Sequence, residues 1–137
     1  MSASQRWWIN VLVISNALIS SLHGLAHEFV SVYLDLPGYI FLTLTVYLLP
    51  FYGLWRLRKG AASSGLGVVF ISLAGALLFG LYKHYIEVSA DHVHHVPGKE
   101  TERLFFQITA HLVLIFGVIG TGYSAWLLGS RQEKLHE

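Results

Sequence analysis

His23 and His27 are four residues apart, and Glu28 directly follows His27. In this 137-residue chain, the two histidines are the residues best suited to chemistry. Side chains four positions apart lie on the same face of a helix, so both imidazoles can reach one object. Neutral imidazole binds zinc, copper and iron, and a carboxylate completes such a site or orients its imidazoles. The spacing therefore predicts a metal site at the end of the first apolar segment.

Two later apolar segments carry polar side chains at helical spacing. His84 and Glu87 are three positions apart, and Gln107 and His111 are four positions apart. With a rise of about 1.5 Å per residue, we expect both pairs at nearly the depth of His23. Buried histidines without partners are costly in lipid, so their convergence requires an ion, a cofactor or a hydrogen-bond network. The predicted metal ligands are His23, His27, His84 and His111, with Glu28, Glu87 and Gln107 as further ligands or orienting groups.

A second histidine-rich signal lies between the last two apolar segments. Asp91, His92, His94 and His95 form a compact tract of the kind that captures divalent ions from solution. We expect this loop to lie above the buried histidines and to deliver or share an ion. The alternative is a polar loop whose histidines titrate near neutral pH without binding anything.

The ligand types limit which cofactor fits. The chain has no cysteine, which excludes disulfides, iron–sulfur clusters and thiolate sites. Imidazole and carboxylate ligands favour copper or zinc, with iron also possible. One alternative is a haem b-binding electron-transfer subunit, with His23 and His111 as axial ligands and nearby glycines admitting the porphyrin. Another is a non-catalytic structural accessory subunit, in which the polar cluster fixes helix register.

Several function classes lack support. The chain contains no HExxH, G-x-S-x-G, P-loop or dinucleotide-binding fingerprint, so a binding protein is favoured over an enzyme. A net charge of +1 argues against nucleic acid as a partner. No inverted repeat of the kind that builds alternating-access transporters is visible.

The elements that must position these residues are membrane-spanning helices. Apolar residues make up 54% of the chain and charged residues 12%, against about 25% charged in soluble proteins, and the mean hydropathy is +0.55. Four apolar segments approach the ~20 residues that cross a bilayer. The short links between them predict an all-α integral membrane protein, a single domain over 1–137 folded as an up-down four-helix bundle. The predicted spans are about 7–33, 38–56, 64–87 and 102–129, with a His-rich extracytoplasmic loop at 88–101.

The basic residues predict the orientation. Six of them fall on the side of both termini: Arg6, Arg56, Arg58, Lys59, Arg131 and Lys134. The positive-inside rule then places both termini in the cytoplasm and the histidines on the outer side. We expect a multi-pass protein of a bacterial inner or plasma membrane, in contact with the lipid bilayer and with other membrane subunits or a second copy of itself.

Cleavage of the first segment is the alternative to this topology. Gly24-Leu25-Ala26 resembles a signal-peptidase site, and cleavage there would remove His23. The preceding apolar run is longer than the roughly 7–15 residues of the apolar region of a signal peptide, so we expect the segment to be retained.

Overall fold

The computed structural model describes residues 1–136, and this part of the chain contains helices and no strands. Four helices are long and apolar enough to cross a membrane: Ala3–Val30, Leu36–Arg58, Ala62–Ile86 and Glu100–Arg131. Each overlaps one of the predicted spans. The last residue of the predicted domain, Glu137, lies outside the described residues. The orientation of the bundle in a membrane stays a prediction.

Helix α1, Ala3–Val30, is fixed at both ends by local hydrogen bonds. Ser2 and Gln5 form a capping box, which satisfies amide groups that the first turn leaves free. Ser31 caps the end of the helix, and its φ of 52° lies in the left-handed region, which turns the chain back. The turn brings the carbonyl of Val32 against the ring of His27, so the end of this helix already fixes one histidine.

The second span consists of three helical segments: α2 (Leu36–Leu42), the π-helical segment η1 (Thr43–Leu48) and α3 (Leu49–Arg58). The side chain of Asp35 caps its start by accepting a hydrogen bond from the amide of Gly38 at 3.0 Å. Pro50 has no amide hydrogen to donate to the preceding turn, and η1 lies directly before it, where a wider turn accommodates the missing bond.

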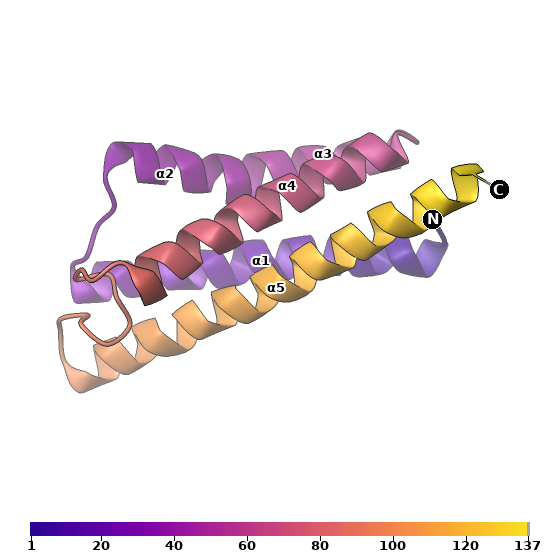
Figure 1. Ribbon diagram of the computed structural model, residues 1–137. Coiled ribbons are helices and arrows are strands. Elements are labelled where there is room, and N and C mark those ends of the chain that lie inside the picture. The colour runs from indigo at the N-terminus through magenta and orange to yellow at the C-terminus, as the bar shows by residue number, and fades with distance from the viewer. Residues whose placement is uncertain (137) are drawn as a thin grey trace.

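The third span is α4 (Ala62–Leu81), which continues into a second π-helical segment, η2 (Tyr82–Ile86). A loop over 87–99 then leads to α5 (Glu100–His136). Figure 1 shows consecutive spans running in opposite directions, with both termini at one end of the bundle and the 87–99 loop at the other.

The four spans do not form a closed square. Helix α1 packs along α5, α5 along α4 and α4 along α3, whereas α1 touches the second span at only a few positions. The α3–α4 contact is very close, because a Cβ atom on Gly53 or on Gly65 would lie 2.8 Å from the other residue's carbonyl oxygen. The sparse contact between α1 and the second span leaves room for a cavity between them.

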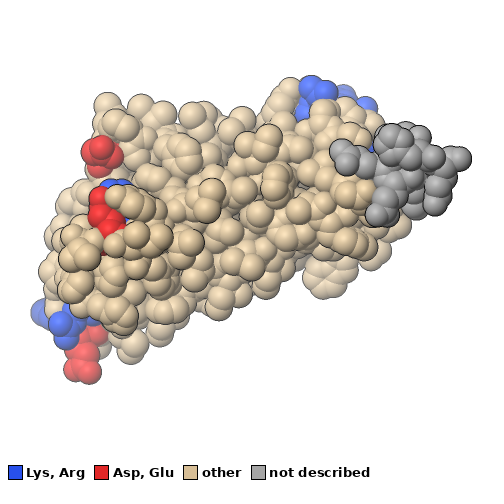
Figure 2. Space-filling view, in the orientation of Figure 1, with Lys and Arg blue, Asp and Glu red and all other residues tan. Residues whose placement is uncertain are grey.

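Two buried clusters form the core. The cluster toward the termini contains Ile9, Val13, Leu54, Leu57, Leu66, Val69, Leu73 and Leu127. The cluster at the loop end contains Ala26, Val30, Val93, Val96, Phe106 and Ala110, so the 87–99 loop folds back into the bundle. On the face shown in Figure 2, charged side chains gather at the two ends and the middle carries none. This distribution is the one expected of a bundle surrounded by lipid.

Candidate metal centre

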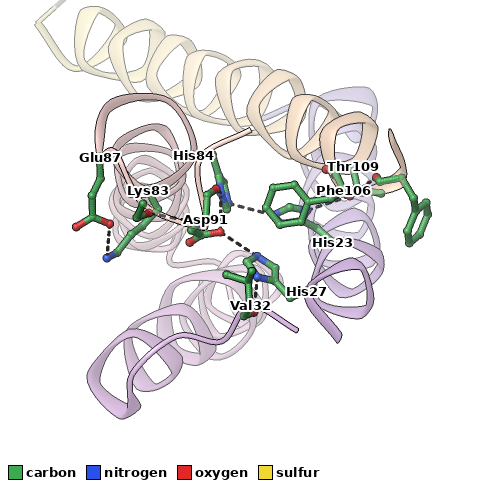
Figure 3. Close-up of polar contacts among 11 residues, drawn as sticks. His23, His27, Val32, Lys83, His84, Glu87, Asp91, Phe106 and Thr109 are labelled. Carbon is green, nitrogen blue, oxygen red and sulfur yellow. Dashed lines mark hydrogen bonds and ion pairs between the residues drawn. The ribbon is translucent and has the colours of Figure 1, made fainter. Parts of the chain in front are cut away.

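Three histidines from two spans meet at the loop end of the bundle, as Figure 3 shows. We call His23, His27 and His84 the histidine triad. One ring nitrogen of each lies within 4.8 Å of the others, and the Nε2 atoms of His23 and His84 are 3.0 Å apart. His23 is 6% exposed and His84 is 7% exposed. The triad is therefore a buried cluster of nitrogen ligands.

Helix geometry explains how the triad is positioned. The spacing of four residues places His23 and His27 on one face of α1, with ring centroids 4.7 Å apart. His84 lies on η2, and π-helical turns of this kind occur frequently at functional sites. Phe106 of α5 packs against all three rings, with centroids 4.9, 4.9 and 5.5 Å away. It closes the apolar side of the cluster.

Backbone carbonyl oxygens fix the protonation of two of the rings. The Nδ1 atom of His27 lies 2.9 Å from the carbonyl oxygen of Val32. The Nδ1 atom of His84 lies 3.0 Å from the carbonyl oxygen of Asp91. A carbonyl oxygen only accepts hydrogen bonds, so both Nδ1 atoms carry the hydrogen.

A hydroxyl group contacts the third ring. The Nδ1 atom of His23 lies 2.9 Å from Oγ1 of Thr109. The same hydroxyl lies 2.9 Å from the carbonyl oxygen of Phe105 and 3.0 Å from that of Phe106. When its single hydrogen is directed to one of these carbonyls, the hydroxyl accepts from Nδ1 of His23, and when that hydrogen is directed to the ring, the hydroxyl donates to Nδ1.

The Nε2 atoms of His23 and His84 are 3.0 Å apart, within hydrogen-bond distance. Since His84 carries its hydrogen on Nδ1, its Nε2 atom has the lone pair. A hydrogen on Nε2 of His23 would be donated to this lone pair, whereas His23 protonated on Nδ1 would direct a second lone pair at it and suit a bound cation. Two ligands of a tetrahedral zinc ion are about 3.3 Å apart, given metal–nitrogen bonds of 2.0–2.1 Å. Metal-binding histidines also typically donate the other ring N–H to an oxygen, as His27 and His84 do here.

Asp91 adds a buried carboxylate beside the triad. Its Oδ1 atom lies 3.1 Å from Nδ1 of His84 and 3.6 Å from Nε2 of His27, and its side chain is 8% exposed. Neither carboxylate oxygen has a well-directed hydrogen bond, because the N–H of His84 points at the backbone carbonyl of the same residue. Burial alone raises the pKa of Asp91, but the contacts with His84, His27 and Lys83 outweigh burial and bring this pKa below its ordinary value. The resulting negative charge favours a cation at the triad.

The 87–99 loop is held in place over the site by its own hydrogen bonds. The amide of Val93 donates to the carbonyl oxygen of His84 at 3.0 Å. The side chain of Gln107 donates to the carbonyl oxygen of Val93 at 2.7 Å. Val93 and Val96 are buried against α1 and α5. Asp91 is thus positioned by a packed segment of the loop.

The structure does not bring His111 into the triad. Its side chain is exposed, its Nδ1 atom contacts the carbonyl oxygen of Gln107 in its own helix, and its ring lies against Tyr85. Positions 109 and 111 point about 200° apart on a helix, and α5 turns Thr109 toward the site. Gln107 and His111, which we expect from their spacing to face the metal, lie outside the group of three histidines, because spacing within a helix does not fix its rotation. His111, the expected haem partner of His23, has its ring against Tyr85.

The remaining predicted residues lie around the triad. Glu28 accepts a hydrogen bond from Tyr33 at 3.3 Å, and Glu87 pairs with Lys83 at 2.7 Å. The rings of the loop histidines, His92, His94 and His95, lie near one another. Among the described residues, however, only the triad brings three potential ligand atoms within 4.8 Å. Asp91, predicted as part of the loop site, lies instead beside the triad.

Sequence reasoning missed the groups that hold the imidazoles. Thr109 lies one helical turn after Phe106, and a threonine at this spacing on an apolar helix is only a weak indication of a histidine partner. The carbonyl groups of Val32 and Asp91 belong to the turns that close α1 and the outer loop. Backbone atoms of this kind carry no sequence signal of their own.

A cavity of about 200 Å³ opens beside the triad, between α1, the second span and α4. The three histidines and Asp91 line one end of it. A metal ion bound by the three ring nitrogens would therefore have one side that faces the cavity.

Comparison with known protein families, with curated proteins and with solved structures finds no match to this chain. The function is therefore inferred from the residues of the site itself.

Proposed function

We propose that this chain is a multi-pass membrane protein that binds one transition metal ion through the Nε2 atoms of His23, His27 and His84. The observation that supports this most strongly is the meeting of one ring nitrogen from each of the three histidines within 4.8 Å of one another. The Nδ1 atom of each ring has an oxygen within hydrogen-bond distance, so Nε2 is free to bind an ion when Nδ1 carries the hydrogen. The negative charge of Asp91 stabilises a bound cation.

Zinc and copper suit this ligand set best. Imidazole is a good ligand for both ions, and the chain has no thiolate that would direct the choice elsewhere. Zinc sites that use three protein ligands keep a fourth position for water or another molecule, whereas structural zinc sites use four protein ligands. The cavity beside the triad provides space for this fourth position. The proposed role is metal handling for a partner, or service as the metal-bearing subunit of a membrane complex.

The proposed location is the outer side of a bacterial inner or plasma membrane. The four apolar helices support insertion, and the basic residues near the termini favour a cytoplasmic position for that end. The triad belongs to the last turns of α1 and to η2, which precedes the 87–99 loop, and Figure 1 shows this loop at the end of the bundle opposite the termini. An ion would then reach it from the extracytoplasmic side or from within the membrane.

The test is metal analysis with a visible absorption spectrum on the full chain purified in detergent. His23→Ala and His84→Ala are compared with His111→Ala and His94→Ala, which remove histidines outside the triad. We expect about one metal ion per chain in the unaltered protein and in both control variants, and loss of the metal in the two triad variants. Equal metal content in all five proteins would contradict the proposal.

The same samples distinguish the two alternatives. A Soret band in the unaltered chain would identify a haem protein. A folded, colourless and metal-free protein that purifies only with a partner would identify a structural subunit.

A further inference from the structure

The cavity beside the triad is elongated and changes in polarity along its length. Its lining includes the triad and Asp91 at the loop end, and Asn16 and Gly117, which lie nearer the termini along α1 and α5. Asn16 precedes His23 by seven residues in α1, so the cavity follows this helix for about 10 Å. The side chains that line it between the two ends are largely apolar, among them Leu42, Val46, Leu77 and Val113.

The cavity does not continue toward the termini. The core cluster of that end, built around Ile9, Leu66 and Leu73, is fully buried. None of the residues in this cluster lines the cavity. The space is therefore shaped for a bound molecule and not for passage through the bundle.

The polar end contains buried groups that lack a partner. Both carboxylate oxygens of Asp91 and the hydroxyl oxygen of Ser20 are buried without a hydrogen bond, and both residues line the cavity. Buried polar atoms in folded proteins nearly always have a partner, so such exceptions require one. A carboxylate only accepts hydrogen bonds. A molecule that fits this end must therefore bring a hydrogen donor.

The side of the cavity near α1 is accessible from the surroundings of the bundle. Gly24 is exposed and lines the cavity, and a Cβ atom there would meet nothing within 4 Å. In this region Ser21 of α1 forms a hydrogen bond with Tyr47 of the second span, at 3.0 Å. In a membrane-spanning bundle, this side of the cavity would face the lipid.

We propose that the cavity binds a neutral, single-chain amphiphile with a hydroxyl head. The head oxygen ligates the metal ion at the position that the triad leaves open, and the head hydrogen is donated to Asp91. The alkyl chain lies along the apolar wall toward Asn16. An anionic head is disfavoured by the carboxylate of Asp91, and a chain without a head leaves the polar groups unpaired. This inference rests on the proposed metal site.

The test uses the full chain in lipid nanodiscs with Co²⁺ as the bound metal and 1-octanol as the probe. The visible d–d bands of Co²⁺ report a change in its ligands. We expect 1-octanol to change these bands saturably, octanoate to require about tenfold or more higher concentration, and n-octane to have no effect.

A glycine substitution tests whether the alkyl chain occupies the cavity. Gly24→Leu places a side chain in open space that belongs to the cavity. Gly122→Leu is the matched control, because a Cβ atom there also meets nothing within 4 Å and Gly122 does not line the cavity. We expect the half-saturating concentration of 1-octanol to rise about tenfold or more in Gly24→Leu. It should remain unchanged in Gly122→Leu, with Co²⁺ bound in both.

The outcomes separate this inference from the metal proposal. A chain that binds Co²⁺ but shows no response to 1-octanol, or the same response in Gly24→Leu, would overturn the amphiphile site and leave the metal site standing. A stronger response to octanoate than to 1-octanol would overturn the hydroxyl head. An unaltered chain that does not bind Co²⁺ would overturn both proposals.

Discussion

The Nε2 atoms of His23 and His84 lie 3.0 Å apart, and the Nδ1 atom of each ring has an oxygen within hydrogen-bond distance. Either a hydrogen on Nε2 of His23 or a bound cation would bridge the two nitrogens. The contact connects α1 with η2, so a cation held there joins two spans of the bundle. The predictions that follow concern the groups that create this arrangement.

Thr109 orients His23 through its hydroxyl group. In Thr109→Val the side chain keeps its shape, but Nδ1 of His23 loses its hydrogen-bond partner at 2.9 Å. Loss of such an orienting partner typically lowers metal affinity about 10–100-fold. Thr109→Ser keeps a hydroxyl and should retain most of the affinity. Competition with a chelator measures the change, and equal affinity in both variants would contradict this role of Thr109.

Asp91 contributes charge to the metal site. Asp91→Asn should lower metal affinity about 10–100-fold, because the neutral amide no longer stabilises the cation. The matched control is Glu87→Gln, which neutralises a carboxylate paired with Lys83 outside the triad. We expect that control to bind metal like the unaltered chain in isothermal titration. A similar loss in both variants would indicate a general effect of charge at this end of the bundle.

The close approach of α3 and α4 depends on two glycines. A Cβ atom on Gly65 would lie 2.8 Å from the carbonyl oxygen of Gly53, so Gly65→Ala forces the helices apart. We expect a lower melting temperature for this variant. Gly67→Ala is the control, because a Cβ atom there meets nothing within 4 Å. Replacing glycine by alanine in a helix is otherwise favourable by up to about 1 kcal/mol, so a melting temperature for Gly65→Ala at or above that of Gly67→Ala would contradict the close-packing account.

The absence of cysteine makes the predicted orientation easy to test. A single cysteine at His94, an exposed position of the outer loop, should react with a membrane-impermeant thiol reagent added to intact cells. A single cysteine at Lys59, between the second and third spans, should react only after the membrane is opened. The opposite pattern would place the triad on the cytoplasmic side.

Much of the fold could be predicted from the sequence because long apolar segments are a strong signal. The spacing of His23 and His27 was likewise sufficient to place both rings on one face of α1. The rotation of α5 was not predictable, since its apolar residues surround the whole helix and leave no clear buried face. Spacing alone therefore predicts His111 at the site, whereas Phe106 and Thr109 lie there. The position of Asp91 depends on how the 87–99 loop packs its two valines, a tertiary effect that local patterns do not carry.

The most direct test of the central claim is X-ray absorption spectroscopy at the zinc edge of the zinc-loaded full chain. The account predicts three imidazole nitrogens and one further light ligand at about 2.0–2.1 Å from the ion. His84→Ala should remove one imidazole or abolish binding, and His111→Ala should leave the spectrum unchanged. A zinc ion without imidazole ligands, or an imidazole number that falls in His111→Ala and not in His84→Ala, would contradict the proposed centre.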